Sequence, residues 1–91
     1  MRYVYDPIKK ATNLKKHGLN FDDAVIVIES GESFTFEDSS LYYGEKRFIT
    51  IGLLQNTLVA IVTTETTETI RIISMRKADK HEKKIFYKYH T

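Results

Sequence analysis

The feature that most constrains this chain is a change in the spacing of its apolar residues near Ser33. From there to Ser74, three segments alternate apolar and polar side chains, and one further segment is continuously apolar. Alternation is typical of a strand with one buried face, and a short apolar run is typical of an interior strand. The alternating segments are 33–37, 47–52 and 69–74, and the apolar one is 58–62. The middle of the chain therefore predicts four β-strands.

The connections between these strands predict their order. Residues 54–57 and 65–68 are short enough to be hairpins, so the last three strands should form an antiparallel meander. Residues 38–45 are polar and contain two tyrosines, which predicts a loop between the first and second strands.

Helix signals flank the strand region. Asp6-Pro7 is typical of an N-cap followed by a first helical residue, and Gly18 is typical of the left-handed residue that ends a helix. Asn20 is positioned to cap a second helix that ends before Gly31. Asp79 and Glu82 have the spacing of a capping box, which predicts a C-terminal helix.

The 91 residues are predicted to form a single domain spanning 1–91, because one core usually organises about 100 to 150 residues. The sequence contains no cysteine, which excludes a disulfide framework, a thiol nucleophile and any cysteine-ligated metal. The predicted fold class is α+β, with two N-terminal helices, a four-stranded antiparallel sheet and one C-terminal helix. No signal peptide or membrane span is indicated, so a cytoplasmic protein without membrane contact is expected.

The net charge of +2 conceals a segregation along the chain. Residues 1–21 carry +4, residues 22–70 carry −7 and residues 71–91 carry +5. If the fold brings the two ends together, they would form a basic face suited to a polyphosphate backbone. Alternatively, these are two ordinary solvated helices whose charges merely cluster.

Several chemistries lack their usual patterns. The four glycines are isolated, so neither a P-loop nor a dinucleotide fingerprint is present. No serine lies in a nucleophile elbow, and the three histidines lack the spacing of metal ligands. We therefore expect no metal site and no cofactor.

Metal-free cleavage of RNA needs only the residue types that remain. The 2′-hydroxyl of RNA is the nucleophile, so the protein must supply a base, positive charge and an acid. Strand alternation predicts that Arg47 shares a face with Ile49 and Ile51, and that Arg71 points away from Ile72 and Ser74. On pattern alone, each of these charged residues is more often a solvated strand-end or helix-face charge than a catalytic group.

Three blocks of the chain, in order, resemble one family. The first contains Tyr5-Asp6-Pro7, Asn13, Lys16-His17-Gly18, Phe21 and Ala24; the second is Gly44-Glu45-Lys46-Arg47 with Ile51-Gly52; the third is Ile70-Arg71-Ile72-Ile73-Ser74-Met75-Arg76-Lys77-Ala78, with Glu82 and Tyr87. Together they resemble the BrnT family of bacterial type II toxins.

This resemblance implies a RelE-like fold and a ribonuclease that inhibits translation. It also implies a BrnA-like antitoxin as partner, with DNA contacted only through the toxin–antitoxin complex. Carried over by position, the predicted catalytic residues are His17, Glu45, Arg47, Arg76 and Lys77. Glu45 or His17 would be the general base, Arg47 and Arg76 would stabilise the phosphate, and Lys77 would bind the backbone or assist the leaving group. The residues predicted to bind RNA are Lys15, Lys16, Arg71, Lys80 and Lys84.

Two other functions remain open. The basic ends would also suit a nucleic-acid-binding module without turnover. The acidic stretch 22–45, or an exposed sheet edge, would suit a module that only binds an antitoxin.

Overall fold

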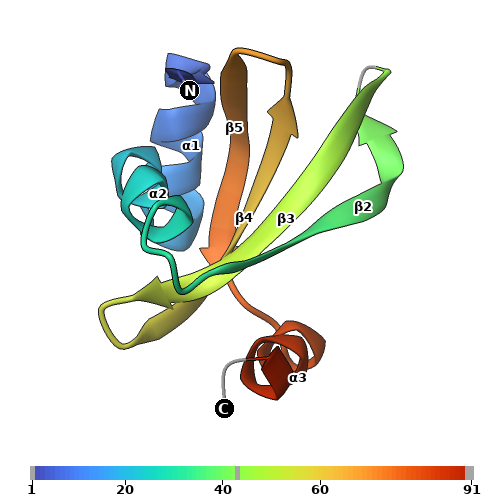
Figure 1. Cartoon of the computed structure of the whole chain (residues 1–91). Helices are drawn as coiled ribbons and strands as arrows, with labels where there is room; N and C mark the ends of the chain where they lie inside the picture. The colour runs from blue at the N-terminus through green and yellow to red at the C-terminus, as the bar shows by residue number, and fades with distance from the viewer. Residues whose placement is uncertain (1, 43, 90–91) are drawn as a thin grey trace.

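One five-stranded sheet organises the computed structural model, which describes residues 2–42 and 44–89. Its elements are β1 (Arg2–Tyr5), α1 (Pro7–His17), α2 (Phe21–Ile28), β2 (Phe34–Tyr42), β3 (Glu45–Leu54), β4 (Thr57–Glu65), β5 (Thr69–Lys77) and α3 (Lys80–Tyr89). The strand order is β1-β5-β4-β3-β2 (Figure 1). β1 runs parallel to β5, and every other neighbouring pair is antiparallel.

Two apolar clusters cover the two faces of the sheet. On the face that we call the α2 face, residues of α2 pack against β4 and β5. On the other, the α3 face, Phe86 of α3 packs near Ile51 and Leu58. The buried members of the first cluster are Phe21, Ala24, Val27, Val59, Ile61, Ile72 and Met75. α3 crosses only one end of its face (Figure 1), so part of that face stays uncovered.

The predicted helices are confirmed together with their caps. The Asp6 side chain accepts a hydrogen bond from the first turn of α1, and Gly18 ends this helix with φ of 70°. Asn20 caps α2 in the same way as Asp6 caps α1. The capping box of α3 is complete: the Glu82 N–H donates to Asp79 Oδ1 at 2.8 Å, and the Asp79 N–H donates to Glu82 Oε1 at 2.9 Å.

The prediction of four antiparallel strands was wrong in one respect. Residues 2–5, expected only as a short extended start, form β1, which pairs in parallel with residues 69–72 of β5. Four residues are too few for an alternating pattern to be recognised. The strand depends instead on the backbone groups that the edge of β5 offers, which only the assembled sheet provides.

The prediction of a loop at residues 38–45 was also wrong. β2 continues to Tyr42 and β3 begins at Glu45, so most of this segment belongs to a ladder. The ladder pairs Asp38 with Arg47 and Leu41 with Lys46, and the extra residues of β2 form an irregularity between them. Polar side chains are tolerated because β2 is an edge strand. Tyr43 lies outside the described residues.

A second irregularity changes which β5 side chains share a face. Val62 pairs with Ser74 and Thr63 with Ile72, so Ile73 is an extra residue in β5. A bulge of this kind interrupts the alternation of the strand. Ser74 therefore joins Arg71 on the α3 face, contrary to the simple alternation that predicted opposite faces.

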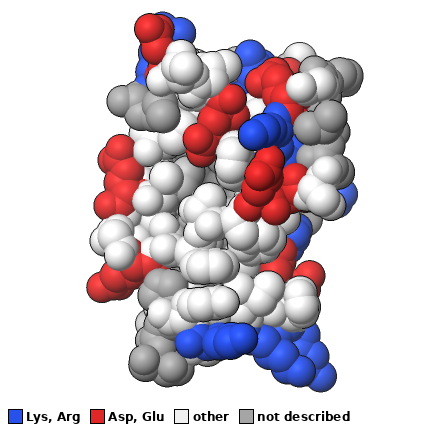
Figure 2. Space-filling model, turned by 45° about the vertical axis from the view of Figure 1, so that its right-hand side comes forward, with Lys and Arg blue, Asp and Glu red and all other residues white. Residues whose placement is uncertain are grey.

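The basic residues of the two chain ends border β5. α1 lies beside this strand, and α3 follows directly from its end. Figure 2 shows basic side chains gathered at the lower end of the molecule, where α3 lies in Figure 1. A mostly uncharged band lies above them, and acidic side chains are prominent above that band. The positive charge of the ends is thus distributed along β5 and its neighbouring helices.

Asn13 connects α1 to the part of β5 that lies beyond β1. Its Oδ1 accepts from the Met75 N–H at 3.1 Å, and its Nδ2 donates to the Met75 carbonyl at 2.8 Å and to the Leu19 carbonyl at 3.1 Å. The side chain is 7% exposed. Asn13 thus supplies the hydrogen bonds that a neighbouring strand would otherwise supply.

We predict that Asn13→Ala lowers the free energy of unfolding by about 3 kcal/mol, because it leaves buried Met75 backbone groups without partners. The measurement is urea denaturation followed by circular dichroism. Thr12→Ala, on the exposed side of the same helix turn, is the matched control and should cost well under half as much. Equal losses in the two variants would contradict the role given to Asn13.

Candidate active-site cleft

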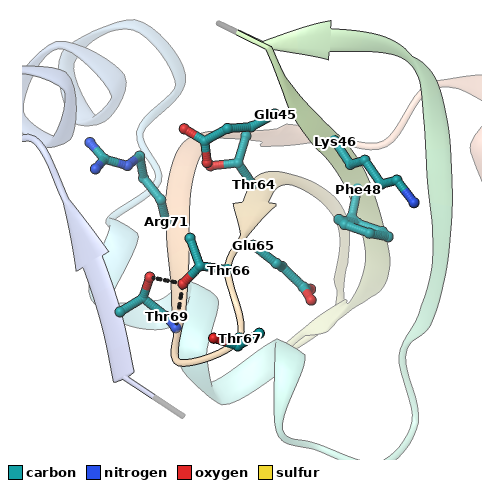
Figure 3. A pocket seen from close by; sticks show the side chains of 9 residues that line it. All are labelled: Glu45, Lys46, Phe48, Thr64, Glu65, Thr66, Thr67, Thr69 and Arg71. Carbon is teal, nitrogen blue, oxygen red and sulfur yellow. Dashed lines mark hydrogen bonds between the residues drawn. The ribbon is translucent and has the colours of Figure 1, made fainter.

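A cleft opens where β3 and β4 part. Their ladder ends at the pair Arg47 and Thr64, although β3 begins at Glu45 and β4 continues to Glu65. The resulting cavity has a volume of about 550 Å³. Figure 3 shows the residues that line it, which are Glu45, Lys46, Phe48, Thr64, Glu65, Thr66, Thr67, Thr69 and Arg71.

Three residues form one row across the sheet beside this cleft. Arg47 of β3 pairs with Thr64 of β4, which pairs with Arg71 of β5. Directly paired residues point to the same side of a sheet, so all three lie on the α3 face. Glu45 precedes Arg47 by two residues and shares its face. A carboxylate, a hydroxyl and two guanidinium groups are therefore gathered at the end of the ladder.

Two donors in this row are buried without a partner. Among the described residues, neither Arg47 Nε nor Thr64 Oγ1 has a hydrogen-bond partner. The terminal nitrogen of Arg47 lies 3.5 Å from Asp38 Oδ2, which is a long ion pair. Buried polar groups are nearly always paired, so adjacent unpaired donors identify a place where an oxyanion could bind.

The cleft also carries groups that would suit a nucleotide. Phe48 provides a half-buried aromatic ring, and Lys46 and Glu65 are exposed charged residues beside it. Because β3 and β4 diverge, side chains from both faces reach the same opening (Figure 3). An aromatic ring next to hydroxyls and charges is an arrangement found in proteins that bind single-stranded RNA.

The cleft gathers only some of the predicted site residues. Glu45 and Arg71 line it, and Arg47 lies in the adjoining row. His17 lies instead in a second cavity between α1 and β5, together with Lys16. The remaining predicted RNA-binding residues, Lys15, Lys80 and Lys84, are exposed on helices α1 and α3.

Arg76 and Lys77 lie on opposite faces of the sheet, and the bulge in β5 decides which of them shares the face of Arg71. Arg76 pairs with Ala60 and lies on the α3 face with Arg71, whereas Lys77 pairs with Val59 and lies on the α2 face. Neither Arg76 nor Lys77 is among the described residues that line the cleft. Thr64 is not among the residues predicted from the sequence, because a threonine next to an apolar run carries no distinguishing pattern.

Arg76 is engaged by Glu82 in a two-point ion pair. Its Nη1 donates to Glu82 Oε1 at 2.7 Å and its Nη2 donates to Oε2 at 2.9 Å. These hydrogen bonds are the main reason that the pKa of Glu82 lies below its ordinary value, and the Asp79 N–H contributes in the same direction. The pKa of Arg76 is raised by the same partner. Glu82 therefore joins the end of β5 to the first turn of α3.

We predict a stability loss in acid that depends on Glu82. Its pKa is lower in the folded than in the unfolded chain. Its contribution to stability is therefore present above about 4.5, the ordinary pKa, and is lost as the pH falls through the lower folded value. Thermal unfolding of the wild type from pH 6 to pH 3 should therefore show a steeper decline than that of Glu82→Gln. Glu68→Gln, an exposed carboxylate, should follow the wild type. Parallel wild-type and Glu82→Gln curves would contradict this account.

The described part of the chain contains neither a cluster of metal ligands nor a membrane-spanning helix. In residues 2–42 and 44–89, no group of three histidine, aspartate or glutamate side chains is placed to hold a metal ion. No helix among these residues is long and apolar enough to cross a membrane.

Comparison with known proteins agrees with the three sequence blocks. The model of the family described as "Ribonuclease toxin, BrnT, of type II toxin-antitoxin system" matches residues 5–82. No curated protein matches the chain. The matched region extends from the end of β1 to Glu82 and contains the whole cleft. This chain therefore belongs to the BrnT family of ribonuclease toxins of type II toxin–antitoxin systems.

Proposed function

We propose that this protein is a metal-independent endoribonuclease that inhibits translation and acts in the cleft between β3 and β4. The observation that carries the proposal is the pair of buried donors Arg47 Nε and Thr64 Oγ1, between Glu45 and Arg71, which have no partner in the described part of the chain. The RelE-like architecture implied by the sequence blocks is part of the proposal. It is compatible with the α+β arrangement of helices and sheet.

The proposed reaction needs no external nucleophile. Glu45 takes the proton of the RNA 2′-hydroxyl, and the 2′-oxygen attacks the adjacent phosphorus. The bond to the 5′-oxygen breaks, so that the products are a 2′,3′-cyclic phosphate and a 5′-hydroxyl. Arg47, Thr64 and Arg71 stabilise the charge on the non-bridging oxygens. Lys46, which lines the same cleft, would protonate the leaving 5′-oxygen.

This assignment narrows the catalytic set predicted from sequence. Glu45 is preferred to His17 as the base because Glu45 lines the cleft. Arg71 is preferred to Arg76 beside Arg47, because the Arg76 guanidinium is held by Glu82. Lys77 is left without a catalytic role, since it does not line the cleft as Lys46 does.

The protein partner follows from the family. A type II system pairs its toxin with a protein antitoxin, and we propose a BrnA-like one. DNA would be contacted through that partner rather than by this chain alone. An antitoxin that covers the cleft would block the proposed reaction directly.

The activity can be tested with purified, antitoxin-free protein and a mixed-sequence RNA in the presence of EDTA. We expect cleavage that leaves 2′,3′-cyclic phosphate ends, and no cleavage of a matched strand with 2′-deoxy positions. Cleavage only after addition of a divalent cation would contradict metal independence. RNA that is bound but left intact, with or without ribosomes, would favour a non-catalytic nucleic-acid-binding module.

A sharper test uses two adjacent threonines. Thr64→Val removes the unpaired hydroxyl with almost no change in shape and should lower kcat about 100-fold, as loss of one oxyanion donor does. Thr63→Val is the matched control, because Thr63 is equally buried but pairs with Phe48 and Ile72 on the α2 face. Urea denaturation should show both variants folded. Equal activity in the two variants would remove Thr64 from the proposed site.

A further inference from the structure

The second cavity lies where α1 meets the bulge of β5. It has a volume of about 270 Å³ and is lined by Lys9, Thr12, Asn13, Lys16, His17, Ile73 and Ser74. His17 and Ser74 are half-buried, and Lys16 is exposed at the rim. This cavity is separate from the cleft, with which it shares no lining residue.

Its chemistry is that of an anion site. The lining contributes two lysine ammonium groups, a histidine and two hydroxyls, and no carboxylate among the described residues. Lysines and hydroxyls are the groups through which proteins most often contact nucleic-acid phosphates. Asn13 cannot contribute a donor, because both N–H bonds of its side chain are directed at the Leu19 and Met75 carbonyls. Asn13 instead holds α1 against β5 where the two elements line the cavity.

The bulge aligns this cavity with the cleft. If side chains alternated without interruption from Arg71, Ser74 would point to the α2 face; because of the bulge at Ile73, Ser74 lies on the α3 face with Arg71. Ile72 and Ile73 separate Ser74 from Arg71, and the three residue steps span at most about 10 Å at the rise of a strand. Phosphates two nucleotides apart in a single RNA strand can span such a distance.

We infer that the cavity formed by Lys16, His17 and Ser74 binds a phosphate of the RNA strand that flanks the scissile bond. This inference rests on the proposed ribonuclease function and assigns to His17 a binding role in place of a catalytic one. The cleft holds the reacting phosphate, and the cavity holds a phosphate further along the same strand. RNA is thereby aligned along β5. A substrate too short to reach the cavity lacks the contact of the flanking phosphate with Lys16, His17 and Ser74.

The experiment compares two substrates that differ only in length. One is a dinucleoside monophosphate, whose single phosphate must occupy the cleft. The other is the same dinucleotide extended by two nucleotides at each end. The variants are Lys16→Gln and Ser74→Ala, and Lys83→Gln is the charge-matched control on α3, away from the cavity. Steady-state cleavage of both substrates is measured for each protein.

For the extended substrate, Lys16→Gln should raise KM about tenfold with little change in kcat, and Ser74→Ala should raise it less. For the dinucleotide, both variants should match the wild type. Lys83→Gln should leave both substrates unaffected. Equal losses on the two substrates would overturn the inference, because they would indicate a catalytic or folding role. Unchanged KM on both would also overturn it.

A binding measurement keeps the inference separate from the proposed function. Fluorescence anisotropy with an uncleavable 2′-deoxy strand should show weaker binding by Lys16→Gln, and a salt dependence that is shallower by about one unit. If the wild type cleaves neither substrate, the proposed function fails, while this arm still decides whether the cavity binds phosphate. If Lys16→Gln weakens binding of the antitoxin and not of the strand, the cavity belongs to the protein interface and the inference is overturned.

Discussion

The side-chain amide of Asn13 is the interaction on which the arrangement of this fold depends. β5 pairs with β1 over only four residues, so its second half would otherwise present backbone groups without a strand neighbour on that side. Asn13 satisfies both the N–H and the carbonyl of Met75 and also binds the Leu19 carbonyl. One buried amide therefore determines where α1 lies against the sheet and how the chain enters α2. A buried polar group is costly when unpaired, so this contact strongly favours a single docking position.

The bulge at Ile73 acts together with this contact. It interrupts the alternation of β5 directly beside Asn13, so that Ile72 and Met75 both reach the apolar cluster under α2. On the opposite face, Arg71, Ser74 and Arg76 come to lie on one side of the strand. In a strand without the bulge, Lys77 rather than Arg76 would lie on the same face as Arg71. The same extra residue thus serves the core on one side and the distribution of charge on the other.

The charged residues of the α3 face divide into two kinds of environment. Arg76 is neutralised by Glu82, a residue that also caps α3, so its charge contributes to holding the C-terminal helix against the sheet. Arg47 has only a long contact with Asp38, and its Nε and the neighbouring Thr64 hydroxyl have no partner among the described residues. Satisfied ion pairs stabilise a structure, whereas buried donors without partners are what a binding site for an oxyanion requires. The contrast explains why two arginines that both belong to the sequence blocks of the family have different proposed roles.

The sequence by itself determined the helices, their caps, the interior strand β4 and the family, because each rests on neighbouring residues or on spacing along the chain. Asp6, Gly18 and Asn20 act on the backbone within a few residues, and the pair Asp79 and Glu82 within three. Glu45, Arg47 and Arg71 were recognised as candidates by residue type and motif. Only the tertiary structure decided that residues 2–5 form a strand, that β2 continues through the polar segment, and that Thr64 rather than His17 stands beside Arg47. These outcomes depend on pairing between distant segments and on a one-residue bulge, and neither leaves a local pattern in the sequence.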